Sequence, residues 1–437
     1  MLENLTSLGY NSMTPIQAQA LPVILEHKDL TAQAKTGSGK TAAFGIGLLH
    51  KLKVEQFRVQ SLVLCPTREL ADQVAKELRR IAKFAHNIKI LTLCGGESFG
   101  KQAHSLSHQA HIIVGTPGRI LKHLNKQTLE LTHLQTLVLD EADRMLDMGF
   151  IEEITSVVAF APKERQTLLF SATFDDEVLE VANNFLQDAT FVEVVSQEQK
   201  AQIEELFFKC EDKDATLLKL LAKYNPSSVM IFANTKIKTQ EIAQYLQEHK
   251  VDALALHGDL EQYERNDVLV QFANHSTPVL VATDVASRGL DIKALPMVIN
   301  YDLPHQQESY THRIGRTARA GEKGMALSLF ADENELELFE MPPSTQDGEA
   351  LDEVKAFEMK PAFVTLVIEG GKKNKLRAGD IVGALMGGAG VAFEEIGKID
   401  IYEKQSYVAI ASSAIDKAYK GLKNNTIKKR KFSVWVL

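Results

Sequence analysis

Short apolar segments alternate with amphipathic helical patterns along most of the chain, and this alternation constrains the fold more than any other feature. In the first part, residues 61–66, 111–117, 134–140 and 166–173 are rich in Val, Ile and Leu, and residues 68–84 have helical spacing. Runs of this kind are typical of parallel strands that helices bury on both faces. The sequence therefore predicts an α/β domain built on a parallel sheet.

The same pattern restarts after about residue 200. Apolar runs at 228–235, 253–258, 278–284 and 297–302 are the predicted strands of this second part, and 241–250 is one of its predicted helices. Two similar α/β halves in tandem indicate duplication, and we expect a cleft between them.

A change of composition marks the end of the second half. Acidic residues crowd into 332–360, around MPPSTQDG, which predicts a short helix and then a flexible linker with few contacts across it. The remaining segment has the order β-α-β-β-α-β, which is the split βαβ arrangement of an α+β domain. The predicted domains are 1–197, 198–340 and 361–437, with 341–360 as the acidic linker.

The composition is that of a soluble multidomain protein. The 437 residues are too many for one ordinary domain, and no apolar run approaches the ~20 residues of a membrane span. The first ten residues lack the basic and apolar segments of a signal peptide. Three scattered cysteines, Cys65, Cys94 and Cys210, predict neither a disulfide framework nor a zinc site. We therefore expect a cytoplasmic protein with no membrane partner.

A glycine-rich loop lies near the start of the chain. Residues 32–41 read AQAKTGSGKT, a P-loop whose glycines let backbone N–H groups close around phosphate. Lys40 can reach the β- and γ-phosphates, and the Thr41 hydroxyl can hold Mg²⁺. The alternative is a simple glycine turn before a helix. The predicted nucleotide-binding residues of this loop are Ala34, Lys35, Thr36, Gly37, Ser38, Gly39, Lys40 and Thr41.

Adjacent carboxylates end a core strand at LVLDEAD, residues 137–143. Repulsion and desolvation penalise this arrangement unless a positive charge lies nearby. In P-loop enzymes a carboxylate at the end of a neighbouring strand holds Mg²⁺, and Asp140 fits that role. Glu141 can then act as the general base on the attacking water. The alternative is a solvated helix N-terminus, where acids are favoured anyway.

Further motifs along the chain match those of one protein family. They are Thr14-Pro15-Ile16-Gln17, Pro66-Thr67-Arg68-Glu69-Leu70, Gly95-Gly96, Thr116-Pro117-Gly118-Arg119, Ser171-Ala172-Thr173, Ala282-Thr283-Asp284, Arg288-Gly289-Leu290-Asp291 and His312-Arg313-Ile314-Gly315-Arg316-Thr317-Ala318-Arg319. With the P-loop and the acidic pair, the chain resembles the DEAD-box ATP-dependent RNA helicases over nearly its whole length. The resemblance implies two tandem RecA-like domains, ATP and Mg²⁺ as cofactors, and RNA as partner.

The resemblance also implies roles for individual residues. Gln17 would read the adenine edge, and Tyr10 is a candidate to pack on the base. Gly289 and Asp291 would contact the nucleotide from the second half. Ser171, Ala172 and Thr173 would couple hydrolysis to unwinding. The implied RNA-binding residues of the two halves are Pro66, Thr67, Arg68, Gly95, Gly96, Thr116, Pro117, Gly118, Arg119 and Arg288.

Two arginines of the last motif are candidate catalytic residues. Arg316 and Arg319 lie three apart, so on one helical turn they point to one face. Placed opposite the P-loop, they can stabilise transition-state charge as arginine fingers. The alternative is that they are ordinary surface arginines, which the surrounding HRIGRTAR motif disfavours.

The C-terminal unit resembles the RNA-binding domain of a bacterial subfamily of these helicases, whose target is the peptidyl-transferase region of 23S ribosomal RNA. An RRM-like fold is implied, yet the expected RNA-stacking strand carries only Tyr407 near the usual aromatic positions. Two basic clusters are predicted to bind RNA, although a charge run is often only a solvated face. Their members are Lys372, Lys373, Lys375, Arg377, Lys428, Lys429, Arg430 and Lys431.

The function implied by this resemblance is local, ATP-dependent unwinding of RNA during assembly of the large ribosomal subunit, on precursor particles and by a monomer. A binding protein is the alternative: an ATP-gated RNA clamp with little unwinding. Glu141, the Ser171–Thr173 motif and the arginine pair favour turnover. A transport ATPase is disfavoured because the sequence contains no LSGGQ-like signature.

Overall fold

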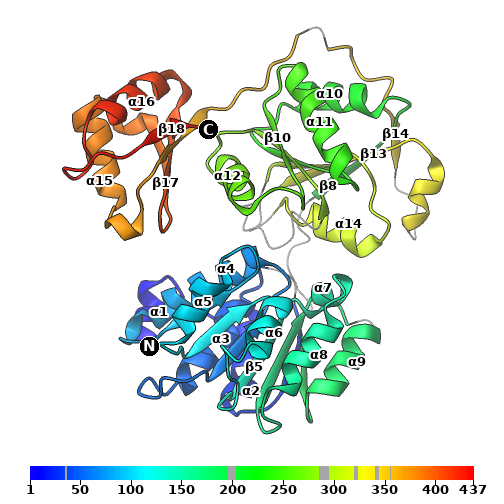
Figure 1. The fold of residues 1–437 in the computed structure, drawn as a ribbon. Helices are drawn as coiled ribbons and strands as arrows, with labels where there is room; N and C mark the ends of the chain where they lie inside the picture. The colour runs from blue at the N-terminus through cyan, green and yellow to red at the C-terminus, as the bar shows by residue number, and fades with distance from the viewer. Residues whose placement is uncertain are drawn as a thin grey trace. The chain divides into compact units, whose positions relative to one another are not determined.

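The computed structural model describes residues 1–34, 37–174, 176–194, 203–284, 295–318, 323–339, 344–354 and 356–437. The chain forms two compact units. The first contains one parallel sheet, and the second contains another parallel sheet together with a small C-terminal sheet (Figure 1).

The first sheet has seven strands in the order β3-β4-β2-β5-β6-β1-β7, and every pair is parallel. Its strands are β1 (Leu30–Gln33), β2 (Ser61–Leu64), β3 (Ile90–Leu93), β4 (Ile112–Gly115), β5 (Thr136–Asp140), β6 (Gln166–Ser171) and β7 (Thr190–Glu193). Its helices are α1 (Leu2–Ser7), α2 (Pro15–Leu25), α3 (Lys40–Lys51), α4 (Arg68–Ile81), α5 (Phe99–Leu106), α6 (Pro117–Asn125), α7 (Ala142–Asp147), α8 (Ile151–Ala159) and α9 (Asp176–Phe185), with a 3-10 turn at Ala82–Phe84.

Alternate strand residues point to opposite faces of this sheet, and each face has its own core. Val63 and Val138 belong to the core that contains residues of α2, α3 and α4. Their neighbours Leu62 and Leu137 belong to the core that contains residues of α5 to α9. Burial on both faces explains why the strands read as continuous apolar runs.

The second sheet repeats this architecture, with seven parallel strands in the order β10-β11-β9-β12-β13-β8-β14. Its strands are β8 (Ile203–Lys209), β9 (Val229–Phe232), β10 (Ala253–Leu256), β11 (Val279–Ala282), β12 (Met297–Asn300), β13 (Gly324–Phe330) and β14 (Thr345–Asp347). Its helices include α10 (Lys213–Tyr224), α11 (Lys236–Glu248), α12 (Gln262–Ala273) and α14 (Gln307–Ile314), and Glu333–Leu338 forms a 3-10 helix.

The acidic segment differs from the flexible linker that its composition predicts. Strand β14 lies within it and adds an edge to the second sheet beside β8. Met359 is buried in the hydrophobic core of the second sheet and pairs with Val251. Leu351 and Phe357 pack against the same core. The physical reason is that apolar side chains interrupt the acids and hold the chain on the domain surface.

The C-terminal domain has one antiparallel sheet, in the order β16-β17-β15-β18, and two main helices. Its elements in sequence are β15 (Phe363–Ile368), α15 (Ala378–Gly383), a π-helical turn (Ala384–Gly388), β16 (Ile396–Ile401), β17 (Ser406–Ala411), α16 (Ile415–Asn424) and β18 (Val434–Val436), with short 3-10 turns at Lys372–Asn374, Phe393–Glu395 and Ser412–Ala414. This is the predicted β-α-β-β-α-β order.

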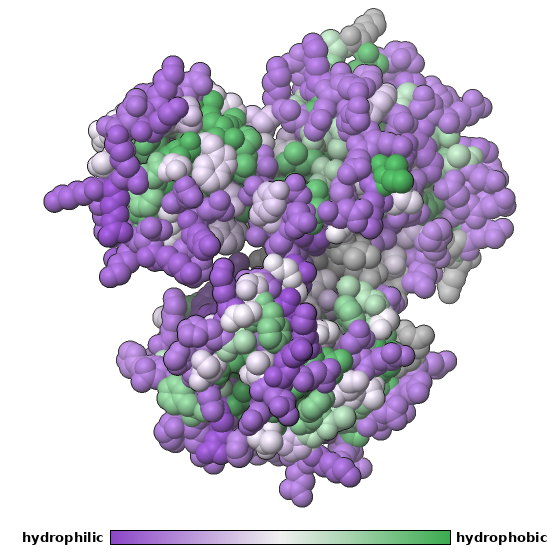
Figure 2. Space-filling view, in the orientation of Figure 1, coloured by the Kyte–Doolittle hydropathy of each residue, from purple (hydrophilic) through white to green (hydrophobic). Residues whose placement is uncertain are grey.

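The fold class is thus confirmed: two tandem RecA-like sheets followed by a small α+β domain. Hydrophilic side chains dominate the face drawn in Figure 2, with apolar ones scattered among them. Within the described ranges, no helix has both the length and the apolar character needed to span a membrane.

Candidate nucleotide and RNA sites

The P-loop joins β1 to α3 through glycines in left-handed backbone conformations. Gly37 has φ +87°, and Gly39, which caps α3, has φ +95°. Lys40 begins the helix; its side chain is buried, and its Nζ donates a hydrogen bond to the Ala34 carbonyl oxygen at 2.9 Å. Left-handed glycines of this kind suit a loop whose backbone N–H groups close around phosphate. Lys35 and Thr36 lie outside the described residues, and Thr41 follows Lys40 in the first turn of α3.

Gln17 ties the start of α2 to the P-loop. Its Oε1 accepts a hydrogen bond from the Thr14 backbone N–H at 3.0 Å, within the capping box of α2. Its Nε2 donates to the Gly39 carbonyl oxygen at 3.2 Å. A Cβ atom at position 39 would lie 2.5 Å from this nitrogen, so the contact itself requires glycine there. The structure thus brings Gln17 to the nucleotide loop, as its predicted role requires.

Tyr10 is held by helix α4. Its hydroxyl bonds to Glu77 and accepts from Arg80 Nη2 at 2.9 Å, and burial raises the pKa of the phenol. These contacts hold the ring where it packs against the core that contains residues of α2, α3 and α4. The packing of Tyr10 on a base stays a prediction.

Asp140 ends β5 with a buried carboxylate. The residue is 2% exposed, and its Oδ1 has no hydrogen-bond partner within the described ranges; the same holds for the buried Oγ of Ser38. Burial raises the pKa of Asp140 to about 6, although Lys40 partly opposes the shift. A buried acceptor without a partner is costly. The donor set therefore suits a hard divalent cation, which takes carboxylate and hydroxyl oxygens.

Glu141 occupies a strained position at the start of α7. Its backbone is left-handed, with φ +55° and ψ +57°, and the residue is 3% exposed. Its Oε2 accepts a charge-assisted hydrogen bond from Arg144 Nη1 at 2.8 Å. Both members of this ion pair are buried, so the orientation of the carboxylate is fixed. Sequence reasoning missed Arg144, which the spacing of three residues on a helix could have indicated.

Asp143 connects the acidic motif to the Ser171–Thr173 motif. Its Oδ2 accepts from the backbone N–H groups of Ala172 at 3.0 Å and Thr173 at 3.3 Å. Its own N–H donates to the Ser171 Oγ at 3.2 Å. The ends of the neighbouring strands β5 and β6 are therefore joined through one buried carboxylate. Sequence reasoning assigned no role to Asp143.

The predicted RNA-binding residues of the first unit gather at the carboxyl ends of β2, β3 and β4, which are neighbours in the sheet. Pro66 and Thr67 follow β2, and the Thr67 hydroxyl caps α4. The Arg68 guanidinium lies over Gly95 and Gly96: a Cβ at Gly96 would come within 1.6 Å of its Nη1, and Gly96 has φ +76°. Two motifs that are distant in sequence thus meet, and the glycines admit the arginine.

The third of these motifs starts α6, with Thr116 as N-cap, Pro117 in the first turn and Gly118 exposed. Arg119 Nη1 donates to the Glu97 carbonyl oxygen at 3.0 Å and to Gln102 Oε1 at 2.8 Å.

Gln102, which sequence reasoning missed, organises this region. Its Nε2 donates to the Cys94 carbonyl oxygen at 3.0 Å, and its Oε1 lies 3.1 Å from His123 Nε2. His123 is fully buried and stacks on Phe99. Burial lowers the pKa of His123 to about 4, with a further contribution from Arg119. The network holds the loop after β3 against the start of α6.

In the second unit, Arg313 is the centre of a buried polar cluster. It is 1% exposed and pairs with both carboxylate oxygens of Asp284, at 2.6 and 2.7 Å. Its Nη1 donates to the Asp302 carbonyl oxygen at 2.6 Å, and its Nη2 donates to Asn234 Oδ1 at 2.8 Å. Two predicted motifs are thus clamped together by an arginine to which the sequence assigned no role.

The remaining predicted residues of the second half are only partly described. Arg316 is described and has a buried side chain. Arg288, Gly289, Asp291 and Arg319 lie outside the described residues.

The basic residues of the C-terminal domain lie on its surface. All eight are exposed: Lys372, Lys373, Lys375, Arg377, Lys428, Lys429, Arg430 and Lys431. Lys428 Nζ donates to the Lys375 carbonyl oxygen at 3.1 Å, so the structure joins the two clusters, and it lies 3.4 Å from Asp380 Oδ2.

A tight turn presents the second cluster. Ile427 and Arg430 exchange both backbone hydrogen bonds across Lys428 and Lys429, which have φ +53° and +62°. Two consecutive left-handed residues form a type I′ turn, where asparagine and glycine are the usual choice. Lysine gives no turn signal, so the sequence alone does not indicate this turn.

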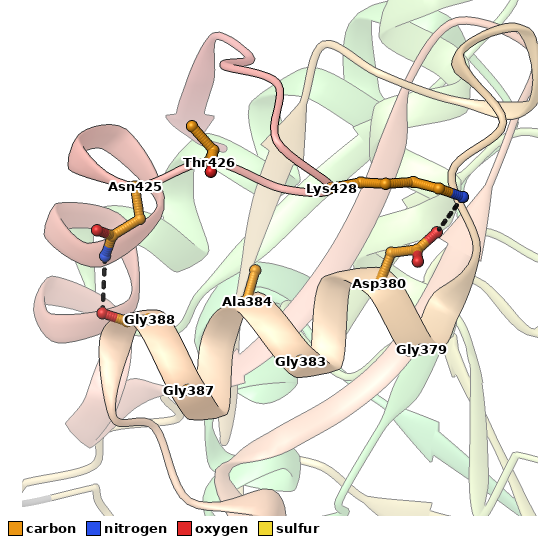
Figure 3. Close-up of a pocket in the computed structure, with 9 residues that line it drawn as sticks. All are labelled: Gly379, Asp380, Gly383, Ala384, Gly387, Gly388, Asn425, Thr426 and Lys428. Carbon is orange, nitrogen blue, oxygen red and sulfur yellow. Dashed lines mark hydrogen bonds and ion pairs between the residues drawn. The ribbon is translucent and has the colours of Figure 1, made fainter.

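An open groove lies beside this turn (Figure 3). The helical segment lines one side with Gly379, Asp380, Gly383, Ala384, Gly387 and Gly388. Asn425, Thr426 and Lys428 line the other side. The Asn425 amide donates to the Gly388 carbonyl oxygen at 2.7 Å and closes one end.

Comparison with known proteins agrees with this arrangement. The chain matches the DEAD/DEAH box helicase family over residues 14–181, the helicase conserved C-terminal domain over 212–321 and the DbpA RNA binding domain over 365–436. It is 50% identical to the ATP-dependent RNA helicase DbpA of Escherichia coli, covering 98% of this chain and 95% of that one. Identity to DbpA of Bacillus subtilis is 38%, with 99% and 96% covered.

Among solved structures, Saccharomyces cerevisiae Dbp5 bound to RNA and ADP BeF3 is similar, with a TM-score of 0.70 and 34% identity over 77% of this chain and 88% of that one. The matched families therefore include the regions that hold the nucleotide loop, the acidic motif and the C-terminal domain. The chain belongs to the DEAD-box family of ATP-dependent RNA helicases and carries a C-terminal RNA-binding domain of the DbpA type.

Proposed function

We propose that this helicase unwinds short RNA duplexes within precursors of the large ribosomal subunit, and that its C-terminal domain selects 23S ribosomal RNA. The single observation that carries the proposal is the merging of two basic clusters on the surface of this domain, where Lys428 contacts Lys375. An exposed cationic surface on an appended, RRM-like domain suits binding to a folded RNA by charge and shape. We further propose a cytoplasmic monomer with domain boundaries at 197 and 360, in which the acidic segment 341–360 belongs to the second domain.

The proposed nucleotide chemistry uses residues of the first unit. Thr41 and Asp140 would hold Mg²⁺, which supplies charge neutralisation at the phosphates. Lys40 would release its bond to Ala34 and bind the β- and γ-phosphates, while Gln17 reads the base. Glu141 takes a proton from the attacking water, as its fixed orientation favours. Arg316 and Arg319 serve as arginine fingers.

The coupling of hydrolysis to unwinding would run through Asp143, whose carboxylate binds the backbone of Ala172 and Thr173. RNA would be gripped by its backbone at the carboxyl ends of β2, β3 and β4, through the loops that Arg68 and Arg119 stabilise. Backbone contacts position RNA without reading its sequence, so selectivity falls to the C-terminal domain.

A salt titration tests the proposal. Affinity for a 23S fragment containing the peptidyl-transferase region is measured for the intact chain and for a variant with alanine at Lys428, Lys429, Arg430 and Lys431. Each lost phosphate contact should reduce the slope of log affinity against log salt by about 0.7–0.9. If the intact chain and the alanine variant show equal slopes and prefer the 23S fragment over an unrelated RNA equally, another part of the chain must select the RNA.

A further inference from the structure

One face of the C-terminal sheet is buried although no helix of its own domain covers it. Leu366 and Val408 point toward α15 and α16 and belong to the core of the domain. Because side chains alternate along a strand, Thr365, Val367 and Tyr407 point the other way. These three residues are only 0%, 1% and 4% exposed. A two-layer α+β domain would leave this face to solvent, so another element must cover it.

The covering element is α12 of the second RecA-like domain, with the turn that follows it. Val270 of α12 forms a buried cluster with Val367 and Tyr407, and Trp435 and Leu437 pack at its margin. Trp435 lies directly opposite Val367 in the pairing of β15 with β18. The cluster therefore spans three neighbouring strands of the sheet.

Polar contacts match the apolar ones. The Tyr407 hydroxyl donates to Asp267 Oδ1 at 2.8 Å. The Thr365 hydroxyl lies 2.8 Å from the Ser276 hydroxyl and 2.9 Å from Asn274 Nδ2. Undocking would break all of these hydrogen bonds together and expose their groups to water. The polar and apolar contacts thus define one geometry.

We propose that this sheet face is an internal docking surface for α12, and that Tyr407 is a positioning residue rather than a platform for RNA bases. In an RRM-type domain, aromatics of this face stack on bases. Here the ring is buried, and its hydroxyl is bonded to Asp267. Docking holds the RNA-selecting domain on the second RecA-like domain as one body. RNA bound at Lys428 is thereby kept at a fixed distance from the second RecA-like domain, which takes part in unwinding.

The single tryptophan of the chain, Trp435, reports docking directly. Val270→Glu places a charge in the apolar cluster and should undock the domain. We expect a red-shifted Trp435 emission and at least about twofold stronger quenching by acrylamide. Asn266→Glu is the matched control, since it adds the same charge at an exposed position of the same helix. Emission and quenching that are identical in all three proteins would overturn the proposal.

Tyr407→Phe and Tyr407→Leu test the same proposal if Val270→Glu fails to fold. Docking predicts stronger quenching for Tyr407→Leu and an intermediate effect for Tyr407→Phe, with the affinity for the 23S fragment unchanged in both. Base stacking predicts instead that the leucine variant alone loses RNA affinity while its emission stays unchanged, and that result would overturn docking.

The dependence of unwinding on the distance between the anchoring hairpin and the duplex is a readout that simple destabilisation of the protein would not change. The intact chain should unwind best at one distance between an anchoring 23S hairpin and the duplex, and Val270→Glu should lose this preference while its RNA-stimulated ATPase stays within about threefold. The spacing assay and the affinity measurements on the Tyr407 variants rest on the proposed ribosomal target, whereas the emission and quenching of Trp435 do not. A preserved spacing optimum in an undocked variant would refute the positioning role.

Discussion

Replacing Asp143 with asparagine should separate nucleotide binding from RNA unwinding. The carboxylate accepts three backbone N–H groups, from Arg144, Ala172 and Thr173. An amide has one acceptor oxygen, so at least one buried donor must face an NH₂ group. Each unpaired buried donor costs about 1–3 kcal/mol. The loss falls on the junction between β5 and β6, whereas the hydrogen bonds of Lys40 and Gln17 go to Ala34 and Gly39.

The expected result follows from the position of that loss. The affinity for ATP should change by less than about threefold, whereas strand release from a short RNA duplex should fall at least about tenfold, since 1.4 kcal/mol corresponds to a factor of ten. Urea denaturation should show a less stable but cooperatively folded protein. Glu152→Gln, which removes an exposed acid from α8, is the control for loss of charge.

Either of two results would refute this reasoning. Normal unwinding by a destabilised Asp143→Asn protein would show that the carboxylate is only structural. Equal losses of ATP affinity and unwinding would show that it acts on nucleotide binding, so that the junction of β5 and β6 does not carry the coupling.

Three further perturbations have defined outcomes. Glu141→Gln keeps the shape of the side chain and removes the base, so ATP and RNA binding should persist in equilibrium assays while hydrolysis falls by about 10²–10⁴. His123 stays neutral in the fold because its pKa is lowered to about 4, whereas the unfolded side chain takes up a proton below about pH 6.5. The free energy of unfolding should therefore decrease as pH falls from about 6.5 to 4, by up to about 1.4 kcal/mol per pH unit, and His123→Gln should flatten this slope in urea titrations. Lys429→Gly relieves a left-handed backbone, so it should raise stability by up to about 1 kcal/mol in thermal melts while weakening RNA binding. Lys428→Gly should gain less, because it also loses the contacts of Lys428 with Lys375 and Asp380.

The sequence was sufficient for most of the architecture. The apolar runs at 61–66 and 228–235 became β2 and β9, trimmed at their ends, because central parallel strands read as continuous hydrophobic segments. The acidic segment was harder to interpret. Its charge predicts solvation, yet Met359 and Phe357 attach it to the second domain, and a few buried side chains outweigh many exposed acids.

The candidate site was predictable where a motif fixes the backbone and less so where contacts are distant in sequence. Asp140 ends β5, and Lys40 begins α3 directly after the P-loop, as expected. Gln102 and Arg313 carry no local signal, because their partners come from other elements. The burial of Tyr407 was likewise hidden, since the residue reads as an RNA-facing aromatic and only the packing of α12 against it removes it from solvent.

RNA-stimulated ATPase activity tests the central claim most directly. Half-saturating concentrations are compared for a 23S fragment from the peptidyl-transferase region and for an unrelated structured RNA of equal length. The intact chain should respond to the 23S fragment at a concentration at least about tenfold lower, a difference of about 1.4 kcal/mol. The variant with alanine at Lys428, Lys429, Arg430 and Lys431 should lose that difference and keep its maximal rate. Equal half-saturation of the intact chain by the two RNAs would contradict the account.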